Sequence, residues 1–521
     1  MAFTTGKRTL RTLLEHRATT TPGDTFVIFD DLSEGVTNLT YREFDVTTNQ
    51  IAHYLLGLGL EPGERINLHL GNCLEFLYLW FGAAKCGIVI MPTNTAASVD
   101  ELEYLLRHSE SRFIFTQPEF ADTAETARRR CPCGEAVIVC GSDADGGLFA
   151  AQFAQQPETP LADMPESGDP VAILYTSGTT AKPKGVLVTN ANYVYAGETV
   201  AKAVRLTPAD RHLAVLPLFH GNAQYYSTMS ALAAGASIAL TARFSASRYF
   251  DQAITHRCTV ASLFAAPIRM LLAQAHNEAH RGNQLRVVLF AQSVSRAQLD
   301  EWHERFGAPL LQLWGMTETM GPPLMNPIDY ARDNMSMGLP VMGYEVALVD
   351  AEGERVVEGE IGEIVVRGEP GSTLMQGYFR NPEATAETLR DGWLWSGDNA
   401  RQDANGYFHF VDRAKDMIKR SGENVAAVEV ESVIQAHPEV FDCAVIGVAD
   451  PIRDESILAI VVVKEGARLS ADDIINWCRP RLASFRTPEF VEFREALPRT
   501  SVGKIQKHIL RREYAAASQS D

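Results

Sequence analysis

The chain has 521 residues, 46% of them hydrophobic and 21% charged, which is an ordinary globular composition and long enough for more than one domain. Its 47 basic and 65 acidic residues give a net charge of −18, so we expect no general nucleic-acid-binding surface. The N-terminus lacks the apolar segment of a signal peptide, and Lys85 interrupts the longest apolar stretch, residues 76–91, so we expect no membrane span.

Helix and strand patterns alternate in the first part of the chain. Thr40 and Glu43 have the spacing of a capping box at the start of a helix. After this helix, strands are predicted at 65–70, 88–91 and 112–116, with helices at 74–85 and 99–107 between them. Residues 118–168 are richer in Ala, Gly, Asp and Pro and are predicted to carry loops. Such alternation predicts a mostly parallel sheet covered by helices.

The alternation resumes after residue 180 and changes character twice further on. Helices are predicted at 191–205 and 247–256, and strands at 212–216, 236–240, 286–290 and 310–314. From about 336, short glycine-rich strand patterns predict a small β subdomain. From about 415, helices are predicted at 428–436 and 470–483, with strands at 442–449, 456–464 and 490–493. We therefore predict an α/β protein with a large N-terminal domain, residues 1–412, and a small α+β domain, residues 413–521, the β subdomain being at about 336–412.

Eight cysteines are scattered along the chain, and the only close pair is Cys131-Pro132-Cys133. No second pair or histidine cluster accompanies it at the spacing of a zinc site. We therefore expect reduced thiols in a cytoplasmic protein, with a metal site or disulfide as the minor alternative.

The segment YTSGTTAKPKGV at residues 175–186 follows a buried strand pattern and leads into a second one. Its glycines, hydroxyl groups and Lys184 suit a loop that donates hydrogen bonds and positive charge to phosphates. It is not the usual P-loop, because Lys184 precedes the glycine and no helix pattern follows. The alternative is an ordinary turn with solvated lysines, and the segment alone leaves both open.

Four later segments are weak separately but specific together and in this order: WGMTET at 314–319, GWLWSGD at 392–398, VDRAKDMIKRSGEN at 411–424 and PRTSVGK at 498–504. With the loop at 175–186 they resemble the motifs of the adenylate-forming superfamily of acyl-CoA synthetases, luciferases and nonribosomal adenylation domains. The resemblance extends from about residue 10 to residue 511. It implies that a carboxylic acid and ATP give acyl-AMP and pyrophosphate, after which CoA gives acyl-CoA and AMP.

The resemblance also implies a nucleotide site. Attack of a carboxylate on the α-phosphate brings two anions together, so cationic and hydrogen-bond-donating groups must surround the phosphates. Thr317 would contact the α-phosphate, Glu318 would hold Mg²⁺ and Trp314 would stack on adenine. Asp398 and Arg413 would bind the ribose, although a turn or cap role is the alternative for Asp398. The implied nucleotide-binding residues are Thr176, Ser177, Gly178, Thr179, Thr180, Lys184, Gln292, Trp314, Gly315, Met316, Thr317, Asp398 and Arg413.

Two lysines of the small domain have implied roles in the reaction. Lys504 matches the lysine that a mobile C-terminal domain delivers to the adenylation site, which suits a charge on a long stem. With Lys184, Thr317 and Glu318 it completes the implied catalytic set. Lys415 matches the hinge, where rotation would withdraw Lys504 and admit the thiol. A solvated linker lysine is the alternative for Lys415.

The implied acyl pocket lacks charge. The segment VLPLFHGNAQYY at 215–226 contains no carboxylate for an α-amino group, which disfavours an amino-acid substrate. The segments DPIRDESI at 450–457 and SFRTPEF at 484–490 are similar to the crotonobetaine/carnitine-CoA ligase branch. Members of that branch carry an acidic residue shortly after the gate histidine, whereas Gly221 and Asn222 follow His220 here, so a cationic acid is not expected.

Small side chains dominate the candidate pocket walls. The implied pocket residues are His220, Gly221, Asn222, Ala265, Ala266, Ala291 and Gly315. These predict room for a bulky acid of secondary metabolism, unless the small residues serve only close packing. We predict an ATP-dependent acyl-CoA ligase that uses ATP, Mg²⁺, CoA and a small carboxylic acid, with a homodimer left open. A ligase that loads a carrier-protein phosphopantetheine, or a non-catalytic ligand-binding relative, is the alternative.

Overall fold

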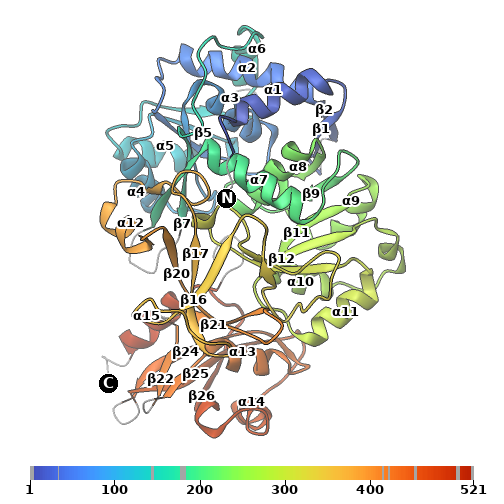
Figure 1. The fold of residues 1–521 in the computed structure, drawn as a ribbon, viewed down its shortest axis with the longest axis vertical. Helices are drawn as coiled ribbons and strands as arrows, with labels where there is room; N and C mark the ends of the chain where they lie inside the picture. The colour runs from blue at the N-terminus through green and yellow to red at the C-terminus, as the bar shows by residue number, and fades with distance from the viewer. Residues whose placement is uncertain are drawn as a thin grey trace.

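The computed structural model describes residues 5–32, 35–141, 146–176, 183–413, 416–420, 423–450, 454–499 and 505–517. In Figure 1 the chain runs from the N-terminal part at the top, in blue, to the C-terminal part at the bottom, in red. Within these ranges every helix is too short or too polar to cross a membrane.

A seven-stranded sheet has the order β18-β8-β7-β4-β3-β5-β6. Its strands β3 to β7 pair in parallel, while β8 and then β18 continue the sheet in antiparallel pairing. The strands are β3 (Arg65–His69), β4 (Val89–Pro92), β5 (Phe113–Thr116), β6 (Ala136–Val139), β7 (Pro170–Thr176), β8 (Lys184–Thr189) and β18 (Gly377–Tyr378). The helices of this region are α2 (Tyr41–Gly57), α3 (Leu74–Cys86), α4 (Val99–Ser109), α5 (Ala121–Arg130) and α6 (Gly146–Ala154).

A nine-stranded sheet has the order β15-β14-β13-β12-β11-β9-β10-β1-β2, with parallel pairing from β13 to β1. The strands are β1 (Thr25–Asp30), β2 (Val36–Thr40), β9 (Arg211–Ala214), β10 (Ser237–Thr241), β11 (Val260–Phe264), β12 (Val287–Ala291), β13 (Leu310–Trp314), β14 (Leu324–Met325) and β15 (Leu339–Pro340). Its helices are α1 (Leu10–Thr20), α7 (Asn190–Ala203), α8 (Ser230–Ala234), α9 (Tyr249–Thr255), α10 (Ala265–Leu272) and α11 (Arg296–Phe306), with a π-helix, η2 (Asn222–Met229).

Two smaller sheets follow. The first contains β16 (Glu345–Val349), β17 (Ile361–Arg367), β19 (Leu389–Arg390), β20 (Trp393–Gln402) and β21 (Phe408–Arg413), with α12 (Pro382–Thr388) beside it. The second contains β22 (Ile418–Arg420), β23 (Glu423–Val425), β24 (Val440–Asp450), β25 (Asp454–Val463) and β26 (Phe490–Phe493), with α13 (Ala427–Gln435), α14 (Ala471–Cys478) and α15 (Lys507–Ala517). In Figure 1 the elements from β22 to α15 form the lower end of the molecule.

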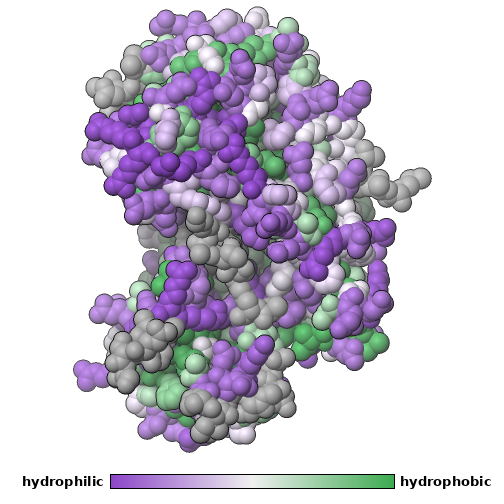
Figure 2. All heavy atoms as spheres, turned by 90° about the vertical axis from the view of Figure 1, so that its left-hand side faces the viewer, coloured by the Kyte–Doolittle hydropathy of each residue, from purple (hydrophilic) through white to green (hydrophobic). Residues whose placement is uncertain are grey.

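The buried hydrophobic residues form separate clusters in the N-terminal part and in the C-terminal part of the chain. The main buried cluster runs from Leu10 to Phe408, and the clusters of the C-terminal part run from Ile418 to Cys478 and from Ala444 to Leu510. Among the described residues, no buried cluster combines the two parts. Figure 2 shows a face that is mostly hydrophilic, where hydrophobic side chains form small separate patches.

The predicted fold class is confirmed, and so is the predicted capping box. The Thr40 hydroxyl accepts a hydrogen bond from the Glu43 N–H at 3.2 Å, and the Glu43 carboxylate accepts one from the Thr40 N–H at 2.8 Å. These two bonds satisfy N–H groups that would otherwise lack partners at the start of α2.

The segment 118–168 carries the predicted loops, but it also contains α5, β6 and α6, which were not predicted. Alanine is a good helix former, and α5 buries Ala124 and Ala127 on one face. On its other face, Glu125 accepts hydrogen bonds from Arg128 and Arg129 at helical spacing. The sulfur atoms of Cys131 and Cys133 lie 2.8 Å apart, and the reduced state of these thiols stays a prediction.

Candidate active site

Three neighbouring parallel strands, β11, β12 and β13, end at the same edge of the nine-stranded sheet. Ala265 follows β11, Ala291 is the last residue of β12, and Trp314 is the last residue of β13. Gln292 comes next after β12 and has a φ of 75°, a left-handed conformation that is uncommon for a side-chain-bearing residue. Ligands of open α/β sheets bind beyond the carboxyl ends of such strands. The edge therefore brings predicted acyl-pocket and nucleotide residues together.

At two of the predicted pocket positions, glycine permits close packing. A Cβ atom on Gly315 would lie 2.5 Å from the carbonyl oxygen of Gly321 and 2.9 Å from the hydroxyl of Tyr226. A Cβ atom on Gly221 would lie 3.0 Å from the ring of Tyr225. Protein atoms already fill the space beside both glycines, so they add no volume for a ligand on that side. Ala265 and Ala266 are also buried.

The gate residue His220 stands just before the π-helix η2, which begins at Asn222. π-helical turns occur often at functional sites. The Oδ1 atom of Asn222 and the hydroxyl of Tyr225 are buried without a hydrogen-bond partner. Burial raises the pKa of Tyr225 well above its usual value, and the nearby Glu318 carboxylate contributes in the same direction. Two polar groups without partners therefore lie next to the gate.

Trp314, Asp398 and Arg413 form one hydrogen-bonded group. The indole Nε1 of Trp314 donates to Oδ2 of Asp398 at 2.9 Å, and Nε of Arg413 lies 3.1 Å from Oδ1. The carboxylate is nearly buried, whereas the Arg413 side chain is 40% exposed. Asp398 and Arg413 are opposite one another in the β20–β21 pair. Each oxygen of Asp398 thus already has one partner, and a sugar hydroxyl would use its remaining acceptor capacity.

The hairpin formed by β7 and β8 positions two further predicted residues. Thr176 and Lys184 are opposite one another at the end of this antiparallel pair. Nζ of Lys184 lies 4.8 Å from the ring centroid of Tyr378, which belongs to the neighbouring strand β18. Tyr378 was not among the residues predicted from the sequence, because it lies outside the motifs that carried the resemblance.

Glu318 lies in a short 3-10 helix, η4 (Thr317–Thr319), that follows β13. Its side chain is buried, and Oε1 accepts a hydrogen bond of 2.9 Å from the hydroxyl of Tyr378. The hydroxyl of Thr319 holds the turn, since it donates to the carbonyl oxygens of Met316 and Gly321, each at 2.9 Å. The loop that carries Met316, Thr317 and Glu318 is therefore fixed by its own hydrogen bonds.

Several predicted residues lie outside the described residues: Ser177, Gly178, Thr179, Thr180, Lys415 and Lys504. The described residues on either side of the Lys504 segment, Arg499 and Ile505, form an antiparallel β-bridge. The side chain of Arg499 forms an ion pair with the buried Asp442 of β24.

A charge contact joins the C-terminal part to the nine-stranded sheet region. Nη2 of Arg269, on α10, lies 3.9 Å from Oδ1 of Asp442, and the side chains are 9% and 1% exposed. Burial lowers the pKa of Arg269, and its Nη1 atom has no hydrogen-bond partner. Burial and the Arg269 charge together lower the pKa of Arg499 to about 10. Two arginines therefore share one carboxylate at this contact.

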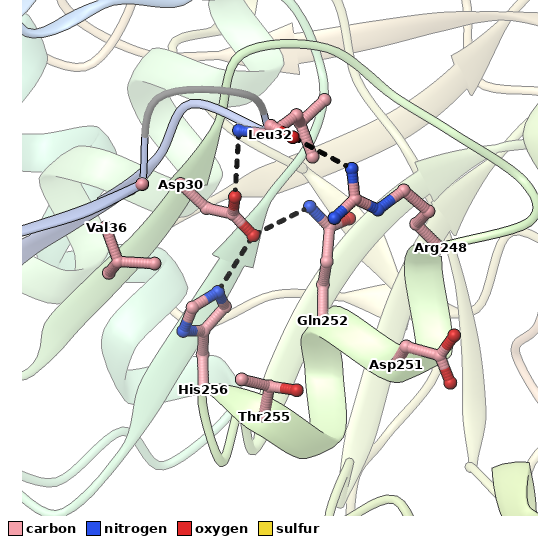
Figure 3. Close-up of a pocket in the computed structure, with 9 residues that line it drawn as sticks. Asp30, Leu32, Val36, Arg248, Asp251, Gln252, Thr255 and His256 are labelled. Atoms are coloured by element: carbon pink, nitrogen blue, oxygen red, sulfur yellow. Dashed lines mark hydrogen bonds and ion pairs between the residues drawn. The ribbon is translucent and has the colours of Figure 1, made fainter.

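A pocket of about 330 Å³ lies at a different place, between β1 and α9 (Figure 3). Its walls include Asp30, Arg248, Gln252 and His256, and none of the predicted site residues. Asp30 accepts hydrogen bonds from Gln252 at 3.1 Å and from the Leu32 N–H at 3.0 Å, and lies 3.0 Å from Nε2 of His256. The Asp30 carboxylate is thus satisfied by its neighbours, although Oε1 of Gln252 is buried without a partner, and the hydrogen bonds to Asp30 indicate a structural contact.

Comparison with known proteins gives matches over nearly the whole chain. Residues 14–379 match the family model described as AMP-binding enzyme, and residues 429–504 match the one described as AMP-binding enzyme C-terminal domain. The crotonobetaine/carnitine–CoA ligase of Salmonella agona (strain SL483) is 36% identical over 517 residues, which cover 97% of this chain and 99% of that protein.

Solved structures show the same similarity. The anthranilate CoA ligase AuaEII in complex with anthranoyl-AMP superposes with a TM-score of 0.90 at 28% identity, covering 98% of each chain. ATP-bound MatB from Rhodopseudomonas palustris gives a TM-score of 0.88 at 27% identity, covering 97% of this chain and 99% of MatB. The apo form of MatB gives 0.77 at 29% identity, covering 98% and 99%.

Proposed function

Because the chain belongs to the AMP-binding enzyme family and is an AMP-forming acyl-CoA ligase, we propose that it activates a bulky, uncharged carboxylic acid at the edge formed by β11, β12 and β13. Two contact groups beside β13 support this proposal: Trp314, at the end of β13, holds Asp398 and through it Arg413, and Glu318, just after β13, contacts Tyr378, which also contacts Lys184. These charged residues belong to four separate segments of the chain. The stability of the fold alone would not require them to lie beside β13.

The nucleotide would be bound through three groups of residues. Thr176, Lys184 and the loop between them bind the β- and γ-phosphates, and Thr317 contacts the α-phosphate. Asp398 and Arg413 bind the ribose. The hydrogen bond from Trp314 to Asp398 supports this arrangement, because it fixes the indole plane on which adenine would stack.

Glu318 would hold Mg²⁺ with the phosphates of ATP. Among the described residues, no group of three or more His, Cys, Asp and Glu side chains could hold a metal ion. The protein thus offers a single buried carboxylate, a donor set that fits a hard cation whose other ligands are phosphate and water. The chemistry that Mg²⁺ supplies there is neutralisation of phosphate charge.

The acid would lie in an uncharged pocket near His220 and Asn222. No carboxylate occurs in residues 215–226 to compensate a quaternary ammonium group, so carnitine is a poor fit despite the name of the Salmonella relative. The similarity to a ligase that was solved with anthranoyl-AMP favours an aromatic acid. Ala265, Ala266 and Ala291 would form the small walls of this pocket.

Two half-reactions would share the site through rotation of the C-terminal domain. The separate buried clusters before and after about residue 412 support a domain division into 1–412 and 413–521. The higher TM-score with ATP-bound than with apo MatB supports an adenylation orientation. In this orientation Lys504 would neutralise the charge that develops between carboxylate and α-phosphate, and rotation at Lys415 would then admit CoA. The cytoplasmic location and a homodimer stay predictions from the sequence.

The test is to incubate the purified chain with Mg-ATP and a pooled library of carboxylic acids, with and without CoA, and to detect acyl-AMP and acyl-CoA by mass spectrometry. The proposal predicts CoA-dependent acyl-CoA from bulky or aromatic acids and none from carnitine. If the acyl-AMP accumulated and ignored CoA, the acceptor would be a carrier protein or another nucleophile. If only carnitine-like acids reacted, the uncharged-pocket assignment would be wrong.

A further inference from the structure

A short segment around β18 connects the phosphate-side hairpin to the turn that carries Glu318. Along β18, the N–H groups of Gln376 and Phe379 donate to the carbonyl oxygens of Leu187 and Gly185 on β8, at 3.1 and 2.7 Å. Just before it, the Met375 N–H donates to the carbonyl oxygen of Glu318 at 2.9 Å. The segment 375–379 is therefore hydrogen-bonded to both sides of the proposed phosphate site.

The side chain of Tyr378 also links the two sides of the proposed phosphate site, because it contacts both Lys184 and Glu318. Its hydroxyl donates to Oε1 of Glu318 at 2.9 Å, and the face of its ring lies 4.8 Å from Nζ of Lys184. The electron-rich face of an aromatic ring attracts an ammonium group, and a phenolic hydroxyl donates well to a carboxylate. One buried residue thus contacts a carboxylate and a cation through different parts of its side chain.

The backbone of Tyr378 is itself held in place. Its N–H donates to the Thr385 hydroxyl of α12 at 2.9 Å. The preceding Gly377 has a φ of 151°, and a Cβ atom there would lie 3.0 Å from the Thr385 side chain. The side chain is accordingly placed before any ligand binds.

We propose that Tyr378 is a positioning residue for Mg-ATP: its hydroxyl orients Glu318 toward the metal, and its ring holds Lys184 toward the phosphates. This inference rests on the proposed function, since it takes Glu318 as the metal carboxylate and Lys184 as a phosphate-binding lysine. A positioned carboxylate needs no reorganisation when the metal arrives, so loss of the hydroxyl weakens the contribution of Mg²⁺ to binding.

Two substitutions separate the two contacts. Tyr378→Phe keeps the ring beneath Lys184 and removes only the hydroxyl, so the Mg²⁺ concentration needed for half-maximal nucleotide binding should rise about tenfold. Nucleotide binding without metal should stay unchanged in this variant. Tyr378→Leu removes the ring as well, so metal-free nucleotide binding should also weaken, by roughly two- to fivefold.

The measurement is calorimetric titration of the full chain with α,β-methylene-ATP, first in EDTA and then over a series of Mg²⁺ concentrations. The control is Tyr41→Phe, because Tyr41 is also buried and donates one hydrogen bond, of 2.7 Å, to the Ala236 carbonyl oxygen away from the site. That variant should lose stability without any change in the Mg²⁺ dependence. Thermal unfolding of each variant reports whether it is folded.

Glu318→Gln separates failure of this inference from failure of the proposed function. If Glu318→Gln abolished the Mg²⁺ dependence and Tyr378→Phe left it intact, the positioning role would be overturned and the metal role of Glu318 kept. If Glu318→Gln itself left the Mg²⁺ dependence unchanged, the proposed metal carboxylate would be wrong, and the role of Tyr378 would fail with it. A loss of stability in Tyr378→Phe without a shift in the Mg²⁺ dependence would mean a purely structural tyrosine and would also overturn the proposal.

Discussion

Trp314 and Asp398 are 84 positions apart in the chain, yet the indole N–H of Trp314 donates directly to the Asp398 carboxylate at 2.9 Å. The bond joins the end of β13 to β20, so the ring that we propose to stack on adenine and the carboxylate that we propose to bind the ribose are held as one unit. Arg413 contacts the other oxygen of the same carboxylate.

Trp314→Phe keeps an aromatic ring and removes this hydrogen bond. Because hydrogen bonds to charged groups are the stronger ones, we expect the dissociation constant for ATP to rise by about tenfold. Equilibrium binding of ATP measures the effect. Trp302→Phe is the matched control, since Trp302 is buried and donates to the Ala308 carbonyl oxygen in the core. Equal weakening of ATP binding in both variants would contradict the role of the Trp314–Asp398 contact.

Lys504→Ala should separate the half-reactions. Loss of one preorganised charge at the developing transition state should slow adenylation by about two to three orders of magnitude. CoA transfer from preformed acyl-AMP should keep its rate, because the proposed domain rotation would withdraw Lys504 in that step. Single-turnover kinetics of each half-reaction measure both rates. An equal fall in the two rates would show that Lys504 does not act in adenylation alone.

The contact between Arg269 and Asp442 predicts an asymmetry between two variants. Arg269→Gln leaves Asp442 paired with Arg499, whereas Asp442→Asn removes the carboxylate charge that both guanidinium groups contact. Removing the only shared carboxylate leaves buried positive charge poorly compensated, which costs more than removing one of the two arginines that contact it. Asp442→Asn should therefore lower the free energy of unfolding more than Arg269→Gln does, by about 3 kcal/mol. Thermal and chemical unfolding measure this difference.

The same contact joins the two parts of the chain in an orientation that resembles ATP-bound MatB. Both variants should therefore slow adenylation and spare CoA transfer. Arg305→Gln serves as the control, because Arg305 is equally buried and donates to two carbonyl oxygens and the Glu301 carboxylate, all in the N-terminal part. If Arg305→Gln also slowed adenylation selectively, the contact would have no special place in domain orientation.

The pocket in Figure 3 predicts a dependence of stability on pH. Burial opposes ionisation of Asp30, but hydrogen bonds from His256, Gln252 and the Leu32 N–H outweigh it and lower the pKa. The stabilisation is therefore present above the unfolded pKa of about 4 and is lost as pH falls through the lower folded pKa.

Asp30→Asn should accordingly be less stable than the natural chain at pH 7, by about 1–3 kcal/mol, and the difference should shrink below about pH 4. Urea unfolding at several pH values measures it. Asp251→Asn, in the same pocket, removes only an exposed carboxylate paired with His280 and should change stability by less than Asp30→Asn at pH 7. If the difference in unfolding free energy between Asp30→Asn and the natural chain stayed constant down to acid pH, the stabilising role of the ionised Asp30 carboxylate would be contradicted.

Local signals predicted much of the fold. The reciprocal pattern at Thr40 and Glu43 specifies a helix start through bonds within three residues, and the hairpin around Thr176 and Lys184 follows from two adjacent apolar runs. The helix α5 was missed, because its apolar face is made only of alanines, and their burial depends on tertiary packing.

The candidate site was less predictable than the fold. Motifs and resemblance supplied Glu318 and Lys184, but the residue that contacts both, Tyr378, is 60 positions from Glu318 and carries no local pattern. The packing beside Gly221 and Gly315 was equally hidden, since only the three-dimensional structure places tyrosines there. Contacts of this kind arise from strand pairing between distant segments.

The most direct test of the central claim is the fate of oxygen in the first half-reaction. The acid identified in the library screen, labelled with ¹⁸O in its carboxylate, would be incubated with Mg-ATP and CoA, and the products analysed by mass spectrometry. Attack of the carboxylate on the α-phosphate predicts that AMP carries one ¹⁸O atom and that pyrophosphate carries none. Label in phosphate or pyrophosphate, with unlabelled AMP, would contradict activation through an acyl-adenylate.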